Sequence, residues 1–180
     1  MVRFLALLLF LSGSTAAPLR AQQQPDSGFD AGTRVRTYAS ALIDPYSWGS
    51  VAASTLIDHI GDNPESWDFG DRALSNGARF VLEESIFHGV AALQDRSTWY
   101  YPCECVGIAE RSAHAFVEAF TDHDRTGATH LSAARISAPY AAAFAEALWR
   151  PDRSFGGAVT TGTTSLIFTG LFNIVREFVR

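Results

Sequence analysis

The sequence predicts an all-α fold, a single-domain bundle of about six helices that follows an N-terminal signal peptide. Combinations of Pro, Gly and Asp that end helices divide the chain after residue 30 into segments of helical length. No hairpin dipeptide separates two alternating apolar runs, so we expect no β-sheet. In the longest segment, apolar side chains recur at helical spacings of three and four residues, at Leu74, Ala78, Val81, Leu82 and Ile86.

Capping residues and helix breakers set the boundaries of the expected helices. Thr33 can cap the first helix, and Asp44-Pro45 ends it. Ser137 can cap the fifth helix, with Pro139 in its first turn, where the missing N–H costs little. The expected helices cover about residues 33–43, 46–60, 67–95, 108–121, 137–149 and 155–179.

The first 21 residues have the pattern of an export signal. Arg3 is followed by the uncharged apolar run 4–11 and by small residues, with cleavage expected after Ala16 or Ala21. An uncleaved signal anchor is the alternative, and the lack of a nearby cysteine argues against a lipoprotein anchor. We therefore expect an exported protein, periplasmic or envelope-associated, with a signal peptide at 1–21, a disordered mature N-terminus at 22–32 and a helical domain at 33–180.

The charge of the chain indicates which kinds of partner it can bind. The net charge is −5, and removal of Arg3 and Arg20 with the signal makes it −7. No basic patch is visible, so nucleic acid is not an expected partner. An unknown protein or envelope component is the expected partner, and association with a membrane stays open.

The Glu/His pairs of the sequence do not predict a metal site. Glu84 and His88 are four residues apart, as are His114 and Glu118, whereas carboxylate-bridged metal sites in bundles use a spacing of three. His123 lies between two aspartates in the polar segment 122–127, which we expect to be a solvated turn in which Asp122→Ala changes little. We expect no catalytic residue, metal ligand or cofactor.

The segment 154–175 contains 22 residues without a charge and has two interpretations. It is long enough to span a membrane, and small residues recur along it at the spacing of packed membrane helices. The alternative is a central helix that is packed on all sides. We favour the central helix, because Thr, Ser and Gly are frequent from 160 to 170 and a polar stripe runs along Thr161, Ser165, Thr169, Asn173 and Glu177.

The only two cysteines, Cys103 and Cys105, are separated by one residue. In an oxidising compartment they can form a disulfide that stiffens the loop between the third and fourth helices. A strained disulfide with a redox role and a two-thiolate clip for a soft metal ion are the alternatives. We expect the structural role.

Four short motifs lie within residues 70–178: Tyr101-Pro102-Cys103-Glu104-Cys105, Arg111 with His114-Ala115, Trp149 with Pro151, and Asn173 with Glu177-Phe178. Together they resemble an uncharacterised family of exported helical proteins from environmental Gram-negative bacteria. The resemblance implies a helical fold and no known activity, and it implies that Arg111, His114, Asn173 and Glu177 belong together. A carboxylate and an amide on an uncharged helix need buried partners, so we expect Glu177 to be hidden and to contact Arg111.

The leading functional hypothesis is a non-enzymatic structural or interaction protein that contains this buried polar network. The alternatives are an envelope enzyme or thiol-redox factor that uses the cysteine loop or the Glu/His pairs, and a membrane subunit that spans through 154–175. An open cleft that gathers His114, Glu118 and Glu177 would favour an enzyme, whereas burial of the same residues would favour a structural role.

Overall fold

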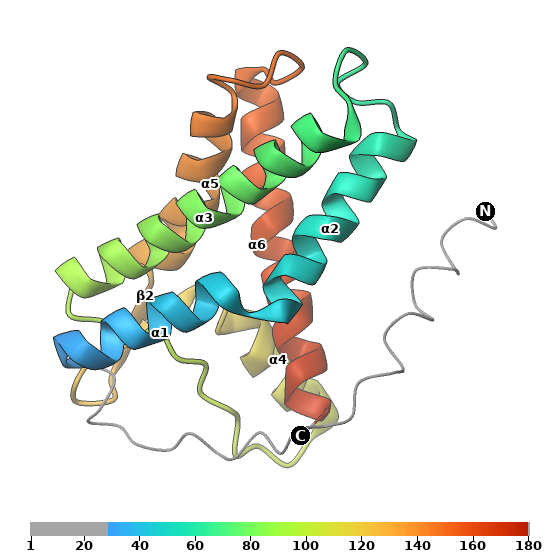
Figure 1. The fold of residues 1–180 in the computed structure, drawn as a ribbon. Helices are drawn as coiled ribbons and strands as arrows, with labels where there is room; N and C mark the ends of the chain where they lie inside the picture. Colours follow the sequence, from blue (N-terminus) through green and yellow to red (C-terminus); the bar gives the residue numbers. More distant parts are fainter. Residues whose placement is uncertain (1–28, 180) are drawn as a thin grey trace.

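A computed structural model describes residues 29–179, and within this range it confirms a mostly helical bundle (Figure 1). The predicted signal peptide and cleavage sites lie outside the described residues. The elements in chain order are α1 (Ala31–Ile43), α2 (Pro45–Ile60), α3 (Phe69–Leu93), α4 (Ile108–Val117), β1 (Thr121–His123), β2 (Thr129–Leu131), α5 (Ala133–Glu146) and α6 (Phe155–Phe178).

Polar side chains cap most of the helices at their N-termini. Asp30, rather than Thr33, caps α1, and its carboxylate accepts a hydrogen bond from the Thr33 N–H. The prediction for the start of α5 was wrong. Ser132 caps α5 by accepting from the Arg135 N–H at 3.1 Å, and Pro139 lies buried inside the helix. Pro139 therefore does not mark a helix start here, because the Ser132 cap begins the helix a full turn earlier.

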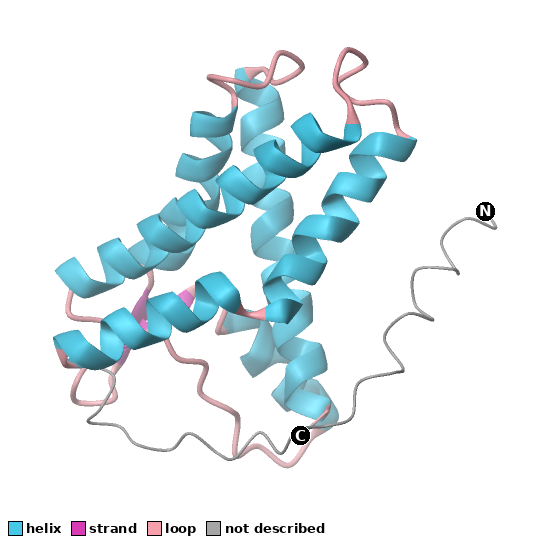
Figure 2. Cartoon of the chain, viewed as in Figure 1, coloured by secondary structure: helices cyan, strands magenta, loops and turns pink. Residues whose placement is uncertain are grey.

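The expectation of no sheet was also wrong, because the segment that we read as a solvated turn belongs to a β-hairpin. β1 pairs antiparallel with β2, with Asp122 opposite His130. Asp122 and His123 are buried in this hairpin, and Gly127 adopts a φ of 82° in its turn. Each strand has three residues, which is too short to show an alternating apolar pattern. Figure 2 shows how small the strands are beside the helices.

Helix α3 crosses the bundle and packs against α1, α2 and α5, while α6 packs against α4 and α5 (Figure 1). Two glycines allow α6 to approach its neighbours closely. A Cβ atom at Gly162 would lie 2.5 Å from the Tyr140 ring of α5, and one at Gly170 would lie 2.6 Å from the Phe116 ring of α4. These glycines bring the backbone of α6 against aromatic rings on both neighbours.

The distribution of polarity is inverted relative to an ordinary soluble bundle. Small side chains, mostly Ala, form much of the apolar core. The largest fully buried side chains are charged or polar, and they include Arg72, Arg150, Glu118, Glu146 and Glu177. Large apolar side chains instead lie outside, on α2 and above all on α6. The expectation of an α6 packed on all sides was therefore wrong: among residues 29–179, α6 packs mainly against α4 and α5, and many of its large apolar side chains are exposed.

Candidate functional site

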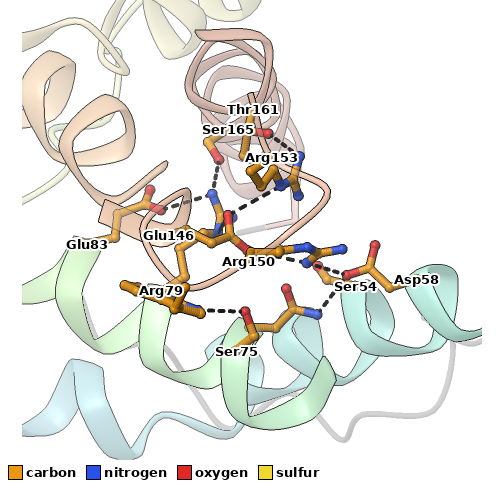
Figure 3. Close-up of polar contacts among 12 residues, drawn as sticks. Ser54, Asp58, Ser75, Arg79, Glu83, Glu146, Arg150, Arg153, Thr161 and Ser165 are labelled. Atoms are coloured by element: carbon orange, nitrogen blue, oxygen red, sulfur yellow. Dashed lines mark hydrogen bonds and ion pairs between the residues drawn. The ribbon is translucent and has the colours of Figure 1, made fainter. Parts of the chain in front are cut away.

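Six charged side chains form what we call the inter-helix ion cluster, between α2, α3, α5 and the loop after α5 (Figure 3). No candidate function was assigned to them from the sequence. The members are Asp58, Arg79, Glu83, Glu146, Arg150 and Arg153.

Arg150 is fully buried and its guanidinium contacts three carboxylates. The distances are 2.9 Å to Asp58 Oδ2, 3.3 Å to Glu146 Oε1 and 2.8 Å to Asp152 Oδ1. It also donates to the backbone carbonyl of Asn63 at 3.1 Å. Burial of this arginine is tolerable because each of its three guanidinium nitrogens has a hydrogen-bond acceptor.

Glu146 lies at the centre of the cluster and is also fully buried. Its Oε1 contacts Arg150, while its Oε2 lies 3.9 Å from Arg79 Nε and 3.7 Å from Arg153 Nε. Arg79 in turn lies 3.8 Å from Glu83 Oε2. Burial raises the pKa of the Glu83 carboxyl, and the nearby Arg79 opposes that rise. Three arginines, one from α3 and two from the loop after α5, therefore surround the Glu146 carboxylate.

Two hydroxyls of α6 join the helix to this cluster. Arg153 donates to Thr161 Oγ1 at 2.7 Å, and Arg79 donates to Ser165 Oγ at 3.4 Å (Figure 3). Thr169, the next member of the predicted polar stripe, is exposed and donates to the Ser165 carbonyl of its own helix. The first half of the stripe thus faces the inter-helix ion cluster.

The second half of the stripe lies among the residues that sequence motifs grouped together. Glu177 is hidden from solvent, and its Oε1 lies 3.2 Å from Arg111 Nε. Tyr100, which the sequence did not single out, donates its hydroxyl to Glu177 Oε2 at 2.6 Å. Asn173 is buried one turn before Glu177, and among the described residues its side-chain amide nitrogen has no hydrogen-bond partner.

His114 lies near this group through a different contact. Its Nε2 lies 2.9 Å from the backbone carbonyl of Tyr101. The Glu118 carboxylate, one turn later, contacts His123 instead of His114, with 3.0 Å between His123 Nε2 and Glu118 Oε1. The structure thus places Arg111 with Glu177, and His114 with the loop that precedes α4.

The Glu118–His123 pair is buried, and sequence analysis missed it. The Tyr101 ring packs against His123, with 4.3 Å between the ring centroids and 53° between the ring planes. The hydrogen bond to Glu118 raises the pKa of His123, and burial works against that rise. The two residues come from the end of α4 and from β1, so no helical spacing could have indicated the pair. In the other proposed pair, His88 Nε2 lies 3.5 Å from Glu84 Oε2.

The cysteine loop connects these contacts. Cys103 and Cys105 form a disulfide, and the two preceding tyrosines supply the contacts to Glu177 and to His123. The loop therefore contacts α6, α4 and the hairpin. Within residues 29–179, no group of three or more His, Cys, Asp or Glu side chains is placed to hold a metal ion.

Two open grooves lie at the opposite end of the bundle, near the start of α3. The first has a volume of about 460 Å³ and is lined by Trp67, Asp71, Leu74, Ser75, Ala78 and Trp149. The second has a volume of about 700 Å³ and is lined by residues 62–66 with Pro151 and Asp152. Neither groove includes His114, Glu118 or Glu177.

Comparison with known proteins adds no family to this picture: no protein-family model, no curated protein and no solved structure matches the chain. The resemblance drawn from short motifs therefore stays a prediction.

Proposed function

We propose that the protein is a non-enzymatic structural or interaction protein of the cell envelope, held in a membrane through α6. The observation that carries this proposal is the inverted polarity of the bundle. Buried positions hold paired ions, whereas large apolar side chains are exposed. In water this arrangement leaves apolar surface uncovered, and in lipid the same surface is in its preferred surroundings.

Helix α6 has the length and composition for such a role. Its 24 residues extend about 36 Å, more than the roughly 30 Å of a bilayer core. An 18-residue window has a mean hydropathy of 1.3, and only 28% of that window is buried in the bundle. The core helix of a soluble protein would be mostly buried. The exposed apolar residues of α6 include Phe155, Ile167, Phe168, Leu171, Phe172, Val175 and Phe178.

The other face of α6 supports the same proposal. Small and polar residues on that face pack toward α4 and α5, and among them Gly162 and Gly170 permit close approach. Close packing over small residues is how helices associate in lipid. Ionisable groups within membrane proteins face the bundle interior and pair with one another, and the buried Glu146 and Arg150 are paired in this way.

A structural role is supported by the environment of the residues that an enzyme would have used. Glu118 and Glu177 are buried, and each has hydrogen-bonding partners from the described residues. Neither of the two grooves opens onto them.

Export remains part of this proposal on the basis of residues 1–21, and N-terminal sequencing of the purified protein should begin at Ala17 or Gln22.

Fractionation of native membranes tests the membrane proposal. We expect the protein to stay in the pellet after alkaline carbonate extraction. Phe168→Gln with Phe172→Gln should move it toward the soluble fraction. The matched control is Val35→Gln with Leu93→Gln, which changes two exposed apolar residues on α1 and α3 and should leave the distribution as in the wild type. Recovery of the wild-type protein as a monodisperse species without detergent would overturn the proposal.

A further inference from the structure

The first groove combines two indole rings with a single ionisable side chain. Its volume of about 460 Å³ falls in the range of small-molecule sites, and its lining is mostly apolar. Asp71 is the only ionisable residue among the lining residues. It belongs to none of the polar contacts described above for α6.

The two indoles are held in place by neighbouring side chains. The Trp149 N–H donates to Ser75 Oγ at 3.0 Å, which ties the loop after α5 to α3. The Arg150 guanidinium lies 5.8 Å from the centroid of the Trp67 ring. Arg150 is itself fully buried and is held by three carboxylates, so it supports the Trp67 ring from the interior of the bundle.

The carboxylate is also held in position. Asp71 lies in the first turn of α3, and its Oδ2 accepts a hydrogen bond from the Asp68 N–H at 3.3 Å. Asp68 Oδ1 accepts in return from the Asp71 N–H at 2.9 Å. This reciprocal capping box fixes the Asp71 side chain at the groove while leaving it exposed.

The charge around the groove is negative on balance. Residues 61–71 contain four carboxylates, of which Asp62 is paired with the buried Arg72 at 2.9 Å. The positive charge of Arg150 is offset by the three carboxylates that contact it, those of Asp58, Glu146 and Asp152. An anionic ligand would therefore be repelled. A cation would be attracted by Asp71 and by the indole surface that Arg150 does not cover, since the Arg150 guanidinium already lies over one face of Trp67.

We propose that the groove between Trp67 and Trp149 binds an organic ammonium group carried on an apolar body. The indoles receive the alkylated cation, and Asp71 pairs with its charge. A free ammonium compound and the headgroup of an amine-bearing lipid share this chemistry. No residue of α6 is among the lining residues of this groove, so the proposal does not depend on α6 being held in a membrane.

Tryptophan fluorescence provides the test, because two of the four tryptophans of the chain line the groove. Choline chloride at constant ionic strength should give a saturable change. The neutral analogue 3,3-dimethylbutan-1-ol should bind at least tenfold more weakly. Equal responses to the charged and neutral compounds would overturn the proposal.

Two variants and a control locate the effect. Asp71→Asn should weaken choline binding at least tenfold, and Ala78→Phe should abolish it by filling the groove without a change of charge. Asp30→Asn alters a capping carboxylate outside the groove and should bind as the wild type does. Unchanged binding in the Asp71→Asn variant would refute the assignment.

Vesicles separate the two sources of the ligand. A fluorescence change with phosphatidylcholine vesicles that depends on Asp71, and that is absent with phosphatidylglycerol, identifies a lipid headgroup. Binding of free choline without such a change identifies a soluble ammonium compound. A vesicle response that Asp71→Asn leaves intact, with no response to free choline, overturns the groove proposal and leaves lipid contact through α6 standing.

Discussion

Replacement of Arg150 by Met should lower the free energy of unfolding more than any single substitution on the surface of the protein. The substitution removes one cation from a site where it contacts the carboxylates of Asp58, Glu146 and Asp152 and the carbonyl of Asn63. The fully buried Glu146 keeps only the longer contacts of its Oε2 to Arg79 and Arg153. Breaking a buried ion pair by removal of one partner costs about 3–5 kcal/mol, since the other charge stays desolvated and unpaired.

Thermal unfolding followed by circular dichroism measures this cost. For a domain of this size each kcal/mol corresponds to about 2–4 °C, so Arg150→Met should lower Tm by roughly 6–20 °C. Arg125→Met is the matched control, because Arg125 forms its salt bridge to Asp95 at an exposed site. Exposed pairs contribute about 0–1 kcal/mol, so the control should shift Tm by no more than about 4 °C. Equal shifts for the two variants would refute the assignment of the inter-helix ion cluster as the stabilising centre.

Two further predictions concern the hairpin and α6. The raised pKa of His123 means that its bond to Glu118 stabilises the fold fully below the unfolded pKa of about 6.5, and that this contribution is lost as pH rises through the folded pKa. Tm should therefore fall from pH 6 to pH 8, less so in Glu118→Gln, and a rise over that interval would contradict the account. Gly162→Ala should cost about 1–3 kcal/mol through its clash with Tyr140, whereas Gly49→Ala, with open space around it, should stabilise α2 by about 0.5–1 kcal/mol. Chemical denaturation of both glycine variants measures the difference, and stabilisation by both would show that α6 does not pack closely on α5.

The helical class was predictable because helix ends and apolar spacings are local properties of the chain. The end of the first helix at Asp44-Pro45 is an example, since α1 ends at Ile43 and Asp44 caps α2. The start of α5 was not predictable from the same signals. Ser132 and Ser137 both offer a cap, and the pairing of β2 with β1, which sequence did not indicate, determines that Ser132 is used.

The candidate sites were predictable only where one helix supplied the signal. Asn173 and Glu177 are one turn apart on an uncharged helix, which marked them as groups in need of buried partners. Glu146 and Arg150 are also four residues apart, but their burial depends on Asp58 and Arg79 from two other helices. Contacts between distant segments decide which of many charged residues are hidden, and a single sequence carries no record of them.

Labelling of single cysteines in permeabilised native membrane vesicles tests most directly whether α6 is embedded in the membrane. In a protein with Cys103 and Cys105 replaced by Ser, Phe168→Cys and Leu131→Cys would each introduce one thiol at an exposed position, since the native side chains are 55% and 75% exposed. A polar maleimide should label Leu131→Cys in the hairpin readily. It should label Phe168→Cys only after solubilisation in detergent, because lipid covers that face of α6. Equal labelling of both thiols before detergent is added would contradict the account.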